Sequence, residues 1–95
     1  MPLFRTPTPE DRARLADDYR ERLALVLRDG WGPYAGTWSS GQTTVVRALL
    51  SGDETEMSAA CEALAPSLWG MDGAAADRAA GFARTYAWLQ EVARG

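Results

Sequence analysis

Residues 8–30 read TPEDRARLADDYRERLALVLRDG, which carries signals for the start, the faces and the end of one helix. Thr8 is a suitable N-cap, and Pro9 suits the first helical position because its missing N–H would have no partner there. Gly30 suits the turn that ends a helix. Apolar side chains recur on one arc, at Leu15, Tyr19, Leu23, Val26 and Leu27. The stretch predicts a helix from Pro9 to about Arg28 that buries one face.

Three further helices are predicted downstream. The first runs from Ser40 or Gln42 to Ser51, the second from Asp53 to Ala65, and the third from Asp72 to about Ala93. Pro66 is expected to end the second of these, and Leu68 and Trp69 to lie in a short turn. The β-branched residues 43–46 are also compatible with a strand, but the chain offers no partner strand.

These patterns predict an all-α fold, a small bundle of four main helices with up-down packing. A glycine-rich and aromatic loop is expected between the first two helices, because Trp31 to Gly41 holds too much glycine for a regular element. Residues 1–8 are predicted to form an extended N-terminal arm, and residues 9–95 a single helical domain. A chain of 95 residues has only a small core.

The composition argues against most enzyme classes. The chain has no His and no Lys, and all ten basic side chains are Arg. Without these residues, Ser-His-Asp, Cys-His and Schiff-base chemistry are excluded, as are the usual zinc sites. The single Cys61 is expected to be a buried structural thiol. We therefore predict no catalytic residues, no metal and no cofactor.

Gly36 to Thr43 has the spacing of a phosphate-binding P-loop, but Gln42 stands where that motif requires Lys. No apolar strand precedes Gly36, which argues against nucleotide hydrolysis. Ala48 and Gly52 have the small-residue spacing of a helix-turn-helix, yet the following helix carries four acids and no Arg. Nucleic acid is therefore not an expected partner.

The candidate site is the aromatic loop with the start of the second helix. Trp31, Tyr34 and Trp38 are predicted either to wall a pocket for an apolar or cationic ligand or to cover the small core. The hydroxyls of Ser39, Ser40 and Thr43 are predicted either to hold a small anion or a partner's carboxylate, or simply to cap the helix.

An oligomer interface is predicted on two helices. Leu25 projects away from the apolar arc of the first helix, and Trp88 and Val92 lie on a second apolar arc of the last helix. A helix with so broad an apolar face must either run through the middle of the bundle or contact a second chain. Leu25, Trp88 and Val92 are the candidate interface residues.

The sequence favours a noncatalytic protein–protein interaction or regulatory module, homodimeric, that presents an apolar and aromatic surface. The alternative is a small-molecule binding protein or enzyme accessory subunit that uses the Trp31–Trp38 loop. No stretch is long and apolar enough for a membrane span, and the absence of Lys, Ile and Asn indicates a GC-rich bacterial genome. A cytoplasmic location is expected.

Overall fold

The chain is described by a computed structural model that covers residues 6–95. These residues form four helices: α1 (Pro9–Asp29), α2 (Ser40–Ser51), α3 (Glu54–Ala79) and α4 (Ala83–Arg94). No strand occurs among these residues. The predicted all-α fold of four helices is confirmed. The predicted division into an arm (1–8) and a domain (9–95) stays a prediction, since residues 1–5 lie outside the described residues.

Helix α1 begins where the sequence predicts. Thr8 Oγ1 accepts a hydrogen bond from Asp11 N over 3.1 Å, and Thr8 N donates one to Asp11 Oδ2 over 2.9 Å. This reciprocal capping box pairs amide groups that a helix otherwise leaves open at its start. Helix α3 also starts at the predicted cap, because Asp53 accepts a hydrogen bond from Glu56 N.

Helix α3 is longer than predicted and bent. Pro66 lies inside the helix rather than ending it, and Leu68 and Trp69 are helical. The helical geometry breaks instead at Gly70, with φ 78° and ψ 176°. We call residues 54–69 the first arm and residues 71–79 the second arm of α3. The prediction placed the break at Pro66 because proline removes one helical hydrogen bond, but the chain accommodates that loss until glycine permits a sharper turn.

The predicted last helix is interrupted. Its first half belongs to the second arm of α3, and a turn at residues 80–82 separates it from α4. Phe82 within that turn has φ 60°, which is in the left-handed backbone region that residues other than glycine rarely adopt. The continuous periodicity of the alanine-rich stretch concealed this break.

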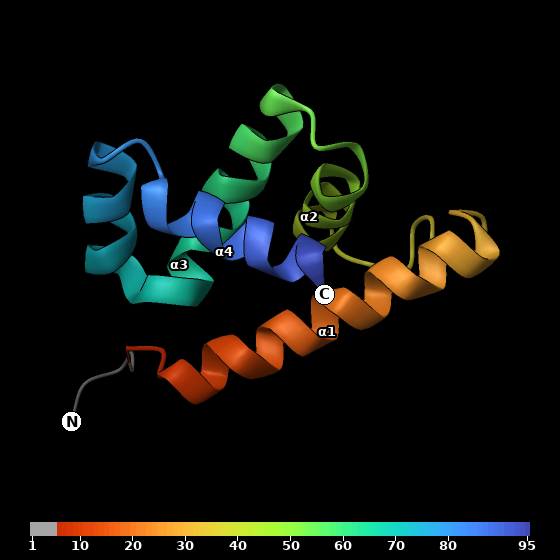
Figure 1. The fold of residues 1–95 in the computed structure, drawn as a ribbon, viewed down its shortest axis with the longest axis horizontal. Helices are drawn as coiled ribbons and strands as arrows, with labels where there is room; N and C mark the ends of the chain where they lie inside the picture. Colours follow the sequence, from red (N-terminus) through yellow and green to blue (C-terminus); the bar gives the residue numbers. More distant parts are fainter. Residues whose placement is uncertain (1–5) are drawn as a thin grey trace.

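The helices cross one another, so the expected up-down packing is wrong. In Figure 1, α1 runs across the lower part of the molecule, α4 crosses above it, and α2 is viewed nearly along its axis. Helix α4 packs against α1, α2 and α3. This central position explains its broad apolar face without a second chain.

All four helices contribute to one core. Its buried side chains are Ala16, Tyr19 and Val26 of α1, Val45, Val46 and Ala48 of α2, Met57, Ala60, Cys61, Leu64 and Leu68 of α3, and Leu89 and Val92 of α4. Among residues 6–95, no helix combines the length and apolar content that crossing a bilayer requires.

Candidate functional site

The predicted aromatic loop packs on itself. Tyr34 stacks on Trp38 with ring centroids 5.0 Å apart, and Trp31 meets Trp38 edge-on at 6.2 Å. Both are favourable geometries for aromatic pairs. All three rings are half-buried against the core. The structure thus brings these predicted site residues together as a cover over one part of the core.

Arginines already lie over the tryptophans of this loop. The Arg22 guanidinium is 4.9 Å from the Trp38 ring centroid, and the Arg47 guanidinium is 5.7 Å from that of Trp31. Asp18 holds Arg22 in place through a hydrogen bond from Arg22 Nε over 2.7 Å. A cationic ligand would therefore compete with the chain's own guanidinium groups for these ring faces.

The loop is fastened to the end of α1 by polar contacts. Arg28 donates two hydrogen bonds to Asp29, at 2.9 and 2.8 Å, and the Tyr34 hydroxyl donates another. Hydrogen bonding from Arg28, and then from Tyr34, lowers the pKa of Asp29 to about 2. The bond to Asp29 raises the pKa of Tyr34. Because Arg28 and Asp29 are exposed, these contacts orient the loop more than they stabilise the fold.

The predicted polar residues at the start of α2 are engaged in the helix itself. Ser39 and Gln42 form a capping box, with Gln42 N donating to Ser39 Oγ over 3.1 Å and Ser39 N donating to Gln42 Oε1 over 3.0 Å. The Ser40 carbonyl accepts a hydrogen bond from Thr44 Oγ1, and Thr43 is half-buried. Capping accounts for this geometry, and we build no anion site on it.

The three predicted interface residues lie in different environments. Val92 is 1% exposed, so its side chain is committed to the core of a single chain and we leave it out of any interface. Trp88 is half-buried and meets Tyr19 edge-on, with centroids 6.4 Å apart. Leu25 is half-buried. Only Leu25 and Trp88 retain surface that a second chain can reach.

A groove of about 240 Å³ lies in the bend between the two arms of α3. Its lining is mostly apolar, with Ala65 and Pro66 from the first arm, Met71, Ala74 and Ala75 from the second arm, and Phe82 from the turn before α4. Glu62 and Arg78 complete the lining, and Arg78 Nη2 lies 3.0 Å from Glu62 Oε1, so one ion pair joins the two arms. Met71 is 73% exposed.

Two glycines create the bend. Gly70 supplies the positive φ that turns the chain between the arms. At Gly73, a Cβ atom would lie 2.7 Å from the Cβ of Trp69, closer than side chains tolerate. The start of the second arm therefore packs closely against Trp69, and only glycine fits at position 73.

The Asp77 carboxylate holds the turn that carries Phe82. Phe82 occupies the N-cap position of α4 but provides no side-chain cap. Asp77 takes over this role, since its oxygens accept hydrogen bonds from Arg84 N over 2.9 Å and Thr85 N over 3.0 Å. The Asp77 carbonyl also accepts a hydrogen bond from Phe82 N over 2.7 Å. These bonds maintain the left-handed backbone that sets Phe82 at the groove.

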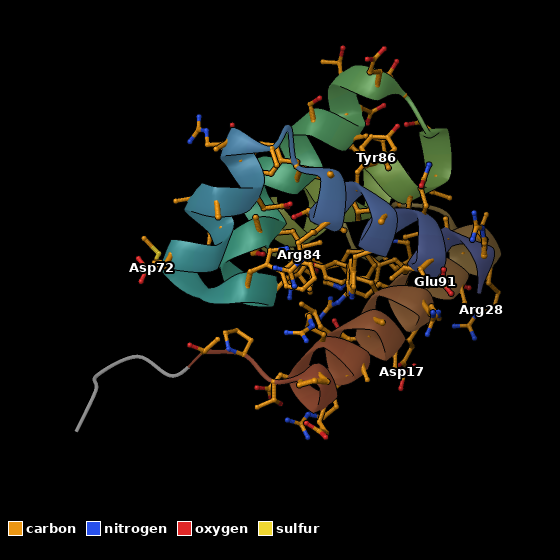
Figure 2. The ribbon with its side chains drawn as sticks, turned by 60° about the vertical axis from the view of Figure 1, so that its left-hand side comes forward. Asp17, Arg28, Asp72, Arg84, Tyr86 and Glu91 are labelled. Atoms are coloured by element: carbon orange, nitrogen blue, oxygen red, sulfur yellow. The ribbon has the colours of Figure 1, made fainter. Side chains whose placement is uncertain are left out.

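Behind the groove, a hydrogen-bonded network ties α3 to α4. Trp69 Nε1 donates to Thr85 Oγ1 over 3.0 Å, and the Thr85 hydroxyl donates to Asp77 Oδ2. The Arg84 guanidinium lies 3.9 Å from the Trp69 ring centroid, close to the bend of α3 (Figure 2). Burial of Asp77 opposes ionisation, but hydrogen bonds from Thr85 and the backbone outweigh it, and the pKa of Asp77 is lowered. The network fixes the groove wall.

This groove was not predicted from the sequence. Its signals were present: Gly70 and Gly73 flank Met71 and Asp72, and Gly81 precedes Phe82. Glycines inside a helical pattern lower the expectation of one continuous helix and favour a bend. Met71 directly follows the bend at Gly70 and is exposed.

Cys61 is 1% exposed, in agreement with the predicted structural thiol. Burial, followed by the negative charge of Asp77, raises the pKa of the Cys61 thiol to about 11. Within residues 6–95, no three His, Cys, Asp or Glu side chains gather as they would around a metal ion.

Comparison with known proteins gives no relative for this chain: no protein-family model, no curated protein and no solved structure matches it. A functional assignment therefore depends on the geometry of the chain's own sites.

Proposed function

We propose that this chain is a noncatalytic protein–protein interaction module, and that the groove in the bend of α3 receives an apolar side chain from a partner protein. The observation that carries this proposal is Met71, a large apolar side chain that is 73% exposed at the edge of an apolar groove. Large apolar residues exposed beside a concave apolar surface are typical of interaction sites.

The size of the groove favours a protein side chain over a small-molecule ligand. Pockets for drug-sized ligands have volumes of about 300–1,000 Å³. An apolar cavity of about 150 Å³ holds one benzene molecule. A groove of about 240 Å³ therefore suits a single aromatic ring or branched aliphatic side chain with the backbone that carries it.

The lining combines an adaptable wall with a fixed one. Met71 has an unbranched, flexible side chain that adjusts to different partner shapes. Phe82 forms the fixed wall, because a hydrogen bond to Asp77 holds the Phe82 backbone in a left-handed conformation. Strained residues persist where surrounding contacts enforce them, and they cluster at binding sites. A strained residue at the groove supports a role in recognition.

The noncatalytic part of the proposal rests on the residues available. The chain has no His and no Lys, and its one thiol, Cys61, is buried with a raised pKa. The two charged side chains at the groove, Glu62 and Arg78, are paired with each other. An activity of the purified chain on any substrate would contradict this part.

The alternative site, the Trp31–Trp38 loop, has weaker support. Its rings contact one another, and Arg22 and Arg47 lie over the two tryptophans. We therefore propose the groove rather than the loop as the binding surface. The homodimer stays a prediction, with Leu25 and Trp88 as its remaining candidate contacts, and light scattering at several chain concentrations tests it.

A pair of neighbouring alanines provides a direct test of the groove. Ala75 lines it and Ala76 does not, although both are exposed on the same arm of α3. Titration calorimetry with a blocked alanine-rich peptide of about 15 residues and one central Phe measures the affinity. We expect Ala75→Gln to weaken binding at least about tenfold and Ala76→Gln to leave it unchanged. Equal affinities for the two variants, or no saturable binding up to about 1 mM peptide, would contradict the proposal.

A further inference from the structure

The methionines of the chain lie in contrasting environments. There are three, Met1, Met57 and Met71, and Met1 lies outside the described residues. Met57 is 5% exposed and belongs to the core, whereas Met71 is 73% exposed and lines the groove in the bend of α3. Gly70, directly before Met71, and Gly73, two residues after it, have no side chain to cover its sulfur atom. Within residues 6–95, Met71 is therefore the methionine that an oxidant in the solvent reaches.

We infer that Met71 is a modification site, and that oxidation of its thioether to a sulfoxide closes the groove to an apolar partner, a proposal that rests on the function proposed above. The oxidant is hydrogen peroxide. A lone pair on Met71 Sδ attacks one peroxide oxygen, the O–O bond breaks and a sulfur–oxygen bond forms. The proton on the transferred oxygen goes to the departing hydroxide. The sulfur is thus oxidised by two electrons, and the peroxide is reduced to water.

The sulfoxide changes the edge of the groove from apolar to polar. It adds a hydrogen-bond acceptor to a side chain that was apolar and flexible. Arg78 is the only side chain in the lining with hydrogen-bond donors, and it is paired with Glu62. A partner that covers the groove removes water from the sulfoxide oxygen, which costs free energy unless a donor replaces that water. Oxidation therefore opposes docking of an apolar side chain.

The fold should tolerate this modification. Met71 is not part of the core, so the oxygen of its sulfoxide stays hydrated in the free chain. Oxidation of Met57 would instead place a polar oxygen among the buried apolar side chains. A loss of binding without a loss of structure distinguishes the reaction at Met71 from oxidative damage to the core.

Mass spectrometry of proteolytic fragments measures which methionine reacts with dilute hydrogen peroxide. We expect Met71 to react at least about tenfold faster than Met57, because a buried sulfur reacts only when local opening exposes it. Circular dichroism of the chain oxidised at Met71 should show the same helical signal as the reduced chain.

Titration calorimetry with the alanine-rich Phe peptide then compares the reduced and oxidised chains. We expect oxidation to weaken binding at least about fivefold, since a polar group loses its water without gaining a partner. Methionine sulfoxide reductases for both sulfoxide epimers, supplied with a dithiol that they oxidise to a disulfide, should restore the affinity.

A pair of methionine variants locates the effect. Met57→Leu should lose affinity on oxidation as the unmodified chain does. Met71→Leu is compared only with itself, before and after peroxide, and its affinity should not change, since leucine has no sulfur to oxidise. Because this variant keeps Met1, Met57 and Cys61, it also controls for oxidation at those residues.

The outcomes separate this inference from the proposed function. Equal affinity of the reduced and oxidised chains, with binding still weakened by Ala75→Gln, overturns the inference and leaves the groove as the docking surface. Equal oxidation rates at Met57 and Met71, unfolding of the oxidised chain, or an equal loss of affinity in Met71→Leu would also overturn the inference. Failure of the reduced chain to bind the peptide overturns the proposed function and the inference together.

Discussion

The carboxylate of Asp77 caps a helix other than its own through Thr85. Asp77 Oδ2 accepts hydrogen bonds from both the backbone N–H and the hydroxyl of Thr85, eight residues later in the chain. Asp77 is 3% exposed and Thr85 is fully buried. This pair fixes where α4 starts, and with it the turn that sets Phe82 against the groove.

Replacing Asp77 should therefore destabilise the chain in a pH-dependent way. We expect Asp77→Asn to lower the free energy of unfolding by about 1–3 kcal/mol at pH 7, since hydrogen bonds to a charged acceptor are lost. The pKa of Asp77 is lowered by folding, so its contribution is complete above the ordinary aspartate pKa of about 3.9 and is lost as the pH falls through the lower folded value. Urea unfolding at pH 7 and pH 3 measures both effects. A difference between variant and unmodified chain that grows at low pH would refute this role.

The Thr85 hydroxyl should matter more than its methyl group. Thr85→Val keeps the shape of the side chain but leaves Trp69 Nε1 without its acceptor and Asp77 without one donor, at a cost of about 1–3 kcal/mol. Thr85→Ser keeps the hydroxyl and loses one methyl group, which costs about 0.8 kcal/mol. Thermal unfolding ranks the three chains. If Thr85→Val were as stable as the unmodified chain, the network would have no part in holding the groove wall.

Gly73 and Gly41 should respond oppositely to alanine. Gly73→Ala places a Cβ atom 2.7 Å from the Cβ of Trp69, which forces the second arm of α3 away and should cost about 1–3 kcal/mol. Gly41 lies in α2 with only Ser39 Oγ near its Cβ position, at 3.9 Å, so Gly41→Ala should stabilise the chain by up to about 1 kcal/mol. Melting temperatures test the pair, and a stabilising Gly73→Ala would mean that the bend is not held against Trp69.

The aromatic loop should behave as part of the core. Trp38→Ala removes the ring that Trp31, Tyr34 and Arg22 all contact, and we expect it to destabilise the chain by about 1–3 kcal/mol, less than a fully buried Trp because Trp38 is half-buried. Peptide affinity at the α3 groove should not change. Loss of peptide binding in a folded Trp38→Ala chain would move the binding surface to the loop.

Local signals were sufficient to predict most of the helices. Thr8 with Pro9, and Asp53 after Gly52, mark helix starts through hydrogen bonds between near neighbours, and the structure has them where the sequence places them. The breaks inside the second half of the chain were mispredicted. Pro66 and Gly70 are both helix breakers, and which one bends the chain depends on the packing of Trp69 against Gly73, a contact that local rules do not contain.

The candidate site was harder to predict because long-range contacts decide it. The cap of α4 comes from Asp77 on the other side of a turn. The residue at the N-cap position, Phe82, has no side chain that can cap, so the local sequence does not mark the start of the helix. For the loop, the sequence left open whether Trp31 and Trp38 wall a pocket or cover the core. Arg22 and Arg47, which lie over these two rings, are distant from them in the chain, so local patterns did not predict these contacts.

The backbone amide shifts of the isotope-labelled chain, followed by NMR while the alanine-rich peptide with one central Phe is added, test the central claim most directly. We predict saturable shifts at Gly73, Ala75 and Phe82, around the bend of α3, and none at Gly32, Tyr34 and Gly36 in the aromatic loop. Shifts confined to the loop, or no shifts at the bend at saturating peptide, would contradict the assignment of the groove as the docking surface.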